Sequence, residues 1–299
     1  MLRAPSTTAL ICLEASARLR SFTSAAQELH LTQGAVSRQI LALEGRLGVK
    51  LFVRRRDALL LTEAGRYYLD EINPFLQRLD RATANVMALK GRGGSLALSV
   101  GASLGSYWLI PRLPAFTSAH SEITLNLATR VGPVDFASMA VDASLEFGDG
   151  KRERLRNEFV MPLDLSPYAS PSWVRQHGAK VSAHTPTAAL IQHSTVPDAW
   201  QGWFELAKMS APPALEAPRY DLMSMAFNVA VAGLGVALLP QFMVDVAVAD
   251  GRLRPLSKRH WRSSKGYYLV YPPESADVNA LQIFRHWLLG QANPQDLST

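Results

Sequence analysis

The 299-residue sequence has a single cysteine, Cys12. One cysteine cannot form a disulfide within its chain, which excludes the disulfide-stabilised scaffolds of small secreted proteins and fits a reducing compartment. Cys12 lies inside the apolar run ALICL, so we expect a buried and unreactive thiol.

Long hydrophobic runs are missing as well. Near the N-terminus, the apolar stretch Ala9 to Leu13 is interrupted by Glu14 and is too short for a signal peptide. The longest other candidate, VAVAGLGVALLP, is broken by Gly233 and Gly235 and stays below the roughly 18 apolar residues of a membrane helix. We therefore expect a soluble, cytoplasmic protein that has no membrane partner.

The signatures of several cofactor sites are also absent. The sequence contains no GxxxxGK[ST] phosphate loop, no HExxH helix and no CxxC pair. The segment AGLGVALLP is only superficially like a glycine-rich nucleotide loop and is better interpreted as a helix end followed by a strand. We expect no metal site, no cofactor and no catalytic site.

The net charge of +6 is unevenly distributed. Residues 1–93 hold 14 Lys and Arg against 8 Asp and Glu, whereas residues 94–299 hold 17 of each kind. The whole basic excess lies in the first third of the chain, which favours contact between that part and a polyanion. The alternative is a basic surface that meets only solvent.

Capping residues predict three helices in this basic part. Ser6 can cap a helix over ALICLEASA, and Thr23 can cap a short helix over Ser24–His30. Thr32 can cap a third helix that ends near Leu47, just before a glycine. The third helix has one apolar stripe, which is formed by Val36, Ile40, Leu43 and Leu47.

The tight turn between the second and third helices predicts a helix-turn-helix, whose second helix fits the major groove of DNA. Polar residues off the apolar stripe gather at the start of that helix. Arg38 can contact guanine or a phosphate, Gln33 suits adenine, and the free N–H groups of the helix can meet a phosphate. The DNA-binding residues predicted here are Thr32, Gln33, Gly34, Ser37 and Arg38.

The next stretch, KLFVRRRDALLLT, predicts two short strands, LFV and ALLLT, around RRRD. Such a hairpin is a wing, and it places Arg54, Arg55 and Arg56 at a tip near the DNA backbone or minor groove. A solvated arginine loop is the alternative, but the position directly after a helix-turn-helix favours DNA contact.

A long helix over about 63–89, capped by Thr62, follows the wing. Its apolar residues repeat in heptad-like steps and are Leu69, Ile72, Leu76, Leu79 and Val86, with Thr83 in the missing position. Such a helix needs a partner to cover it, so we expect a homodimer through this linker helix. Pro74 should bend the helix, and GRGGS at 91–95 should form a flexible hinge.

These residues resemble the LysR-type transcriptional regulators. SFTSAAQELHLTQGAVSRQILALEGRLGVKLFVRR and LTEAG carry the resemblance, and SYWLIPRLPAF, VDASLEFGDG, SPYASP and AVAGLGVALLP look like the effector domain of the branch that regulates glycine cleavage and beta-lactamase expression. Two positions depart from the family pattern: Gly34 stands where Pro or Ala is usual, and Leu41 stands where Arg or Lys is common. The second departure removes one phosphate contact, which lowers the salt slope of DNA binding by about one unit.

From Ser95 the pattern changes to strands that alternate with helices, which predicts an α/β fold with a mostly parallel sheet. SLALSVG, EITLNLAT and DASLEFG are predicted strands, and helices are predicted over SYWLIPRLPAFTSAH and around Val134–Ala140. The resemblance implies two lobes of the periplasmic-binding-protein type with a cleft between them. Lobe one comprises 94–166 and 268–299, and lobe two comprises 167–267.

Ser103 stands in GASLG, which fits the G-x-S-x-G pattern of serine hydrolases. A hydrolase needs a sheet and an oxyanion loop before this serine, and no later histidine stands in a recognisable catalytic context. A cleft residue is the stronger interpretation, because a hydroxyl and free N–H groups at a helix start suit the carboxylate of a small ligand. A simple N-cap at Ser103 or Ser106 is about equally consistent with the pattern.

Further cleft candidates follow from the strand and helix ends. Glu146 ends the strand DASLEFG and can recognise an amine or, equally, pair with an arginine of its lobe. Trp200 and Trp203 share one helical face, which favours the core over a ligand platform. The effector-binding residues predicted in total are Ser103, Ser106, Thr129, Glu146, Met223 and Ser224.

The sequence thus predicts a transcriptional regulator with a winged helix-turn-helix over 1–62, a linker helix and hinge over 63–93, and an effector-binding domain over 94–299. Double-stranded promoter DNA and a small-molecule effector are its predicted partners, and the resemblance implies a homotetramer that contacts RNA polymerase. Two other classes stay open. One is a serine hydrolase built on Ser103, and the other is an architectural DNA binder that responds to no ligand.

Overall fold

The computed structural model describes residues 4–55, 58–88, 94–136, 139–211 and 217–291. They form two compact units, one made mainly by residues up to 92 and the other mainly by residues from 93 on. No helix within the described ranges combines the length and the apolarity that crossing a membrane requires.

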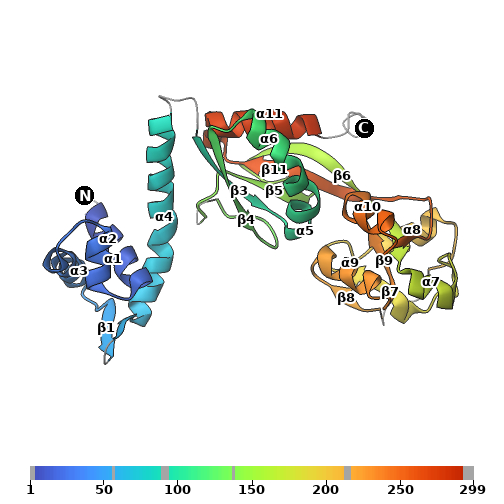
Figure 1. Cartoon of the computed structure of the whole chain (residues 1–299), viewed down its shortest axis with the longest axis horizontal. Helices are drawn as coiled ribbons and strands as arrows, with labels where there is room; N and C mark the ends of the chain where they lie inside the picture. Colours follow the sequence, from blue (N-terminus) through green and yellow to red (C-terminus); the bar gives the residue numbers. More distant parts are fainter. Residues whose placement is uncertain (1–3, 56–57, 89–93, 137–138, 212–216, 292–299) are drawn as a thin grey trace. The chain divides into compact units, whose positions relative to one another are not determined.

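The first unit begins with three helices, α1 (Thr7–Leu19), α2 (Phe22–Glu28) and α3 (Gln33–Leu47), which pack on one another (Figure 1). Apolar side chains from all three helices enter one core, together with Leu51 and Phe52. Cys12 is fully buried in this core, as predicted. This arrangement of three short helices confirms the predicted helix-turn-helix.

The helix caps follow the predictions at two of three positions. The Ser6 hydroxyl accepts the N–H of the third helical residue of α1, and the Thr32 hydroxyl does the same in α3. The predicted cap of α2 at Thr23 is wrong, because Ser21 is the extended residue whose hydroxyl accepts a helical N–H. The earlier start places Phe22 inside the helix, where its ring packs edge-on against Phe52.

The wing and the long helix complete the first unit. β1 (Phe52–Arg55) and β2 (Ala58–Leu61) pair antiparallel, with Phe52 opposite Leu61, which confirms the predicted hairpin. α4 (Glu63–Ala88) follows, and the Thr62 hydroxyl accepts the Gly65 N–H at 3.0 Å, as expected of its cap. Residues 91–93 of the predicted hinge lie outside the described residues.

The second unit is built on strands in the order β4-β3-β5-β11-β6-β9-β7-β8. β3 (Gly94–Val100), β4 (Ile123–Thr129) and β5 (Ala143–Gly148) run parallel and form the sheet of lobe one. β6 (Arg156–Ala169) and β11 (Trp261–Tyr271) are long, and each extends through both lobes (Figure 1).

Lobe two has shorter strands. They are β7 (Leu190–His193), β8 (Arg219–Tyr220) and β9 (Val236–Leu239), with β10 (Arg254–Pro255) on the other edge of β6. The helices of lobe one are α5 (Ala102–Leu104), α6 (Leu113–Ala119) and α11 (Asn279–Gln291). Those of lobe two are α7 (Pro171–His177), α8 (Ala199–Leu206), α9 (Met223–Val231) and α10 (Gln241–Ala249).

The sheet is mixed rather than mostly parallel. β6 and β11 pair antiparallel to each other, and β11 also pairs antiparallel to β5. The reason is topological: one of these strands leads the chain out of lobe one and the other leads it back, so the two must run in opposite directions. Periodicity alone could not show this crossing.

Two helix predictions in lobe one also need correction. The described residues around Val134–Ala140, which are 134–136 and 139–140, are not helical. The helix predicted over SYWLIPRLPAFTSAH is divided into a π-helical turn at Gly105–Leu109, a 3₁₀ turn at Ile110–Arg112 and α6. Pro111 and Pro114 lack the N–H that a continuous α-helix needs, which explains the division.

Other predictions for lobe two are confirmed. Trp200 and Trp203 lie buried on α8, in the core. The segment AVAGLGVALLP is the end of α9 followed by β9, and Gly233 between them has a φ of 81°, a conformation that favours glycine.

Candidate functional site

The start of α3 is an exposed polar surface on the first unit. Thr32, Gln33 and Gly34 are exposed, and the Thr32 Oγ1 accepts the Ala35 N–H at 3.2 Å. A Cβ built on Gly34 meets no atom within 4 Å, so the place of a side chain there is open. The helix presents its first N–H groups beside this open surface, which suits an anion such as phosphate.

Arg38 lies one turn further along the exposed face of α3. Among the described residues, no carboxylate pairs with its guanidinium and no side chain bonds to Gln33. The predicted apolar stripe is confirmed by Val36, Ile40 and Leu43, which are buried below this face. The polar groups of α3 are therefore available to a partner while its apolar side is occupied by the core.

Leu41 and Leu47 are exceptions on α3. Leu41 is 55% exposed, at the position where the resemblance leads one to expect a basic residue. Leu47, the last member of the predicted stripe, is 37% exposed rather than buried, because the helix ends there at Gly48. The exposed surface of α3 thus includes two leucine side chains beside its polar groups.

A buried carboxylate joins α3 to the wing. Glu44 accepts the Leu51 N–H at 2.9 Å, the Phe52 N–H at 3.3 Å and a hydrogen bond from the Lys50 ammonium at 2.7 Å. Burial alone raises the pKa of this carboxyl, but the bonds from Lys50 and from the two backbone groups outweigh burial and hold the pKa below its ordinary value of 4.5. Sequence reasoning missed this residue, because a glutamate on a helix is usually exposed.

The wing arginines are described only in part. Arg54 and Arg55 are strand residues of β1 rather than residues of the hairpin tip. Arg56 lies outside the described residues. Their contacts with DNA remain predictions.

The long helix α4 has two apolar sides. Leu69, Ile72 and Leu76 pack against the core of their own unit, so the front half of the predicted seam is already covered. A second stripe, spaced by four and seven residues, is exposed and comprises Phe75, Leu79 and Val86. Leu79 and Val86 belong to the predicted seam, so the second half of that seam, with Phe75 added, is an apolar surface of α4 that lacks cover among the described residues.

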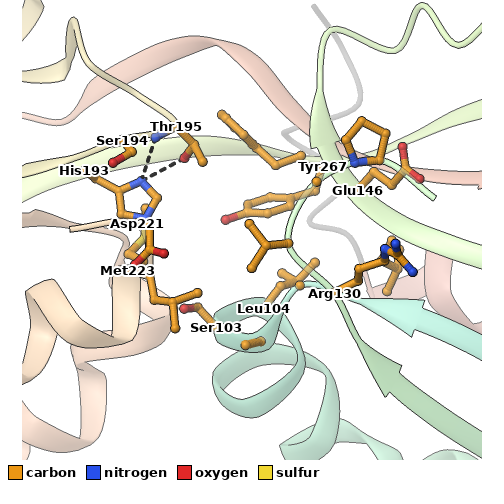
Figure 2. A pocket seen from close by; sticks show the side chains of 18 of the residues that line it. Ser103, Leu104, Arg130, Glu146, His193, Ser194, Thr195, Asp221, Met223 and Tyr267 are labelled. Carbon is orange, nitrogen blue, oxygen red and sulfur yellow. Dashed lines mark hydrogen bonds between the residues drawn. The ribbon is translucent and has the colours of Figure 1, made fainter. Parts of the chain in front are cut away.

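In the second unit, a cavity of about 540 Å³ opens between the two lobes. Its walls come from the carboxyl ends of β3, β4 and β5 in lobe one and of β7 and β8 in lobe two, with the crossing strands β6 and β11 behind (Figure 2). The carboxyl ends of strands are where open α/β sheets bind ligands. The volume lies within the range of about 300–1,000 Å³ that small-molecule pockets occupy.

Three of the predicted effector-binding residues line this cavity, namely Ser103, Glu146 and Met223. Ser106, Thr129 and Ser224 are not part of its lining. The interpretation of Ser103 or Ser106 as an N-cap is wrong, since Gly101 is the capping residue of α5. Whether the lining residues contact an effector remains a prediction.

Ser103 and Ser224 instead meet each other across the cleft. The Ser103 Oγ in lobe one accepts the backbone N–H of Ser224, at the start of α9 in lobe two, at 3.1 Å. The hydroxyl hydrogen of Ser103 is still free to donate to a ligand. No histidine of the described chain is hydrogen-bonded to this hydroxyl, as a hydrolase nucleophile requires.

Glu146 is already paired within its lobe. Its carboxylate accepts a hydrogen bond from the Arg152 guanidinium at 2.7 Å and another from the Val134 N–H at 2.9 Å. Of the two roles left open for this residue, recognition of an amine or pairing with an arginine, the structure shows the pairing.

Sequence reasoning missed several polar residues of the cavity. They are Arg130, His193, Asp221, Lys265 and Tyr267. No local pattern marks them, because they come from β11, from the end of β7 and from the segments after β4 and β8, which only the folded sheet brings together.

His193 occupies the end of β7 beside Asp221 (Figure 2). Its Nδ1 lies 2.7 Å from the Thr195 hydroxyl and accepts the Thr195 N–H at 3.4 Å, which leaves the ring proton on Nε2. Burial lowers the pKa of this histidine, although the Asp221 carboxylate and backbone act in the opposite direction. The ring is therefore neutral at pH 7.

Metal chemistry has no obvious place in this cavity. Across the described ranges of the chain, no three His, Cys, Asp or Glu side chains converge as metal ligands do. The cavity is lined instead by hydroxyls, single charges and apolar walls, which is typical of a site that binds a small organic molecule.

Two family models match the chain. One, described as "Bacterial regulatory helix-turn-helix protein, lysR family", matches residues 7–66. The other, described as "LysR substrate binding domain", matches residues 90–293. Together they cover both units.

Two relatives are similar to nearly the whole chain. The glycine cleavage system transcriptional activator of Escherichia coli is 34% identical over 294 residues, which are 97% of this chain and 95% of that protein. The HTH-type transcriptional activator AmpR of Rhodobacter capsulatus is 33% identical over 293 residues, which are 95% of this chain and 96% of that protein.

Solved structures show a similar fold. The effector domain of the transcriptional regulator AmpR of Pseudomonas aeruginosa matches with a TM-score of 0.59 and 26% identity, over 66% of this chain and 95% of that one. CrgA, a LysR-type transcriptional regulator from Neisseria meningitidis, matches in fold over 97% of this chain and all of its own length, with a TM-score of 0.54.

Proposed function

The chain belongs to the LysR family of bacterial transcriptional regulators, and from that membership we propose how its own residues perform the regulation. Residues 1–62 form the DNA-binding domain, 63–93 the linker helix and hinge, and 94–299 the effector-binding domain. The N-terminal DNA-binding domain reads promoter DNA, and the C-terminal effector-binding domain responds to a small molecule. The ranges of the two matching family models support this division.

The α3 surface enters the major groove. One observation carries this assignment: Gln33 and Arg38 are exposed and have no bonding partner in the described chain, directly after the capped start of a helix whose opposite side is buried. Arg38 donates to a guanine edge or a phosphate, and Gln33 to an adenine edge. The wing arginines Arg54, Arg55 and Arg56 add phosphate contacts beside this groove.

Two protomers pair through α4. The exposed stripe of Phe75, Leu79 and Val86 supports this proposal, because a helix rarely leaves three large apolar side chains in water. Pairing presents two copies of α3 to successive major grooves of a partly palindromic site. A second contact between pairs makes a homotetramer, which bends the DNA and meets RNA polymerase.

The interlobe cavity binds the effector. Ligand binding there shifts the balance between arrangements of the subunits, because the cavity is bounded by both lobes. The hydrogen bond between Ser103 and Ser224 joins the two lobes in one such state of the effector-binding domain. We propose a cytoplasmic location, which a promoter-binding role and a lone buried cysteine both support.

Replacement of Arg38 tests the DNA-binding proposal. Arg38→Ala removes one groove contact, which is worth about 1–3 kcal/mol, so the affinity for a duplex from the chain's own upstream region should fall about tenfold or more. The matched control is Arg78→Ala, which removes the same charge from an exposed position on α4. Fluorescence anisotropy with a labelled duplex measures both variants. Equal affinity of Arg38→Ala and Arg78→Ala refutes the placement of α3 in the groove.

A hydrolase function is not supported by the site. Ser103 is bonded to a backbone N–H across the cleft, and His193 in the same cavity is bonded to Thr195. We propose that the chain is not an enzyme. Turnover of p-nitrophenyl esters that disappears in Ser103→Ala is the result that would overturn this view.

A further inference from the structure

One large apolar side chain lies on the exposed face of α3. Leu41 is 55% exposed, whereas its neighbours Ile40 and Leu43 are each 2% exposed and belong to the core of the first unit. Each residue of an α-helix is rotated by about 100° from the one before it, so a residue next to a buried one in the sequence can point to solvent. Leu41 is therefore an outward-facing residue of a helix whose other large apolar side chains point mainly inward.

No apolar side chain of α3 is placed to cover this leucine. Side chains three and four positions apart are the ones that meet along a helix, and for Leu41 these are Ser37, Arg38, Glu44 and Gly45. The Glu44 carboxylate is bonded inside the fold, and a Cβ built on Gly45 meets no atom within 4 Å. Apolar contact for Leu41 would therefore have to come from another molecule.

The position of Leu41 indicates which molecule this is. Gly34, Arg38, Leu41 and Gly45 follow one another in steps of four, three and four, so they share one exposed side of α3. This side includes Arg38, which we place in the major groove, and it belongs to the part of the chain that holds the whole basic excess. A single exposed leucine is ordinary on a protein surface, but one that stands a helical turn from a groove-reading arginine faces DNA.

The chemistry of the groove limits what Leu41 can contact. Its side chain neither donates nor accepts a hydrogen bond, so it cannot read the polar edges of guanine, adenine or cytosine. The apolar group that the bases present in the major groove is the C5-methyl of thymine. The helix rise of about 1.5 Å per residue places Leu41 about 4.5 Å along the axis from Arg38, which is close to the spacing of about 3.4 Å between base pairs.

We propose that Leu41 is a specificity-determining residue, which packs against the methyl group of a thymine one or two base pairs from the base or phosphate that Arg38 contacts. A basic residue at this position would bind the phosphate backbone, which carries no sequence information. The leucine exchanges that contact for a preference for thymine in each half of the site. The inference rests on the proposed function, because it assumes that α3 lies in the major groove.

Uracil-containing DNA tests the proposal, because uracil differs from thymine only by the missing methyl group. The full-length protein is titrated with a duplex from its own upstream region, prepared once with thymine and once with uracil at every thymine position, and fluorescence anisotropy gives both affinities. The wild type should prefer the thymine duplex by about fourfold or more per half-site, the effect of burying one methyl group. Leu41→Ala should lower this preference by about fourfold per half-site.

A matched control separates this contact from a general loss of apolar surface. Leu47→Ala removes the same side chain from the same helix, but at its last residue and on the side of the buried stripe. This variant should keep the thymine preference of the wild type. Circular dichroism shows that both variants are folded. Duplexes with a single uracil should then assign the preference to one thymine in each half-site, and this position should lose its effect in Leu41→Ala.

The remaining outcomes overturn the inference. They are an equal thymine preference in the wild type and in Leu41→Ala, and the absence of a preference in the wild type. A lower sedimentation coefficient of Leu41→Ala with an unchanged thymine preference also overturns it, because the leucine then contacts a second copy of the chain. In each of these cases, tighter binding of the upstream duplex than of a shuffled duplex leaves the regulator function standing. Equal binding of these two duplexes by the unmodified protein refutes the function itself.

Discussion

Replacement of Glu44 should selectively destabilise the first unit. In the folded chain this carboxylate satisfies the N–H groups of Leu51 and Phe52, where the chain leaves α3 and enters the wing. Glu44→Ala leaves both groups without an acceptor, and each orphaned buried N–H costs about 1–3 kcal/mol. The Lys50 side chain is 69% exposed, so its ammonium returns to water at little cost. The expected loss is therefore about 2–6 kcal/mol, a large part of the stability of a small unit.

The position of the tryptophans allows this loss to be measured in the whole protein. All six tryptophans lie after residue 93, in the second unit, so their fluorescence does not report on the first unit. Circular dichroism at 222 nm reports on the helices of both units. Unfolding of the first unit, which we call the early transition, is followed by circular dichroism. In Glu44→Ala its midpoint should lie about 10 °C or more below that of the wild type. The fluorescence transition, which reports on the second unit, should keep its midpoint.

Glu44→Gln and a surface control refine the test. The glutamine keeps one carbonyl oxygen that can accept the Leu51 N–H. The midpoint of the early transition of Glu44→Gln should therefore lie between those of the wild type and Glu44→Ala. Glu28→Gln breaks an exposed ion pair with Arg18 and should leave the early transition in place. If Glu44→Ala unfolds like Glu28→Gln, the carboxylate does not hold the wing and our reasoning is refuted.

The same contact sets a pH dependence. The pKa of Glu44 is lower in the folded state than its ordinary value of 4.5, so its contribution to stability is present above that pH and is lost as the pH falls through the lowered folded value. The difference in midpoint between the wild type and Glu44→Gln should shrink below about pH 4.5. A constant difference down to pH 3 would contradict the lowered pKa.

Three other substitutions have defined outcomes. Gly65→Ala should lower the early transition, because a Cβ there overlaps the Leu51 carbonyl oxygen; an unchanged midpoint contradicts this packing. Leu41→Arg places a cation on the exposed face of α3 and should steepen the salt slope of duplex binding by about one unit per protomer, measured by anisotropy between 50 and 200 mM salt. Leu79→Glu puts a charge into the exposed stripe of α4 and should shift sedimentation toward the monomer at micromolar concentration, whereas an unchanged sedimentation coefficient excludes α4 as the pairing surface.

Local features of the first unit could be predicted from the sequence. Ser6, Thr32 and Thr62 cap helices as expected, since the cap depends only on a side chain and the backbone a few residues on. The seam on α4 was predicted as one surface for a partner, but only its second half is uncovered, because a heptad pattern shows that a helix has an apolar side and not which partner covers it. Ile72 faces its own unit, whereas Leu79 and Val86 are exposed together with Phe75.

Nonlocal features could not be predicted in the same way. The antiparallel crossing of β6 and β11 depends on which lobe each strand enters, and nothing in an eleven- or fourteen-residue strand records that. Asp221 and Tyr267 meet in one cavity although 45 positions separate them in the sequence. Ser103 was placed in the cleft because it follows a strand end, where the sheet geometry itself creates the site.

The most direct test of the account is binding of the purified full-length protein to a duplex from its own upstream region, measured across a series of salt concentrations. We expect tighter binding than to a shuffled duplex of the same composition, an affinity that falls with salt, and loss of the preference in Arg38→Ala. Equal affinity for both duplexes at 50 mM salt would contradict the claim that α3 reads promoter DNA.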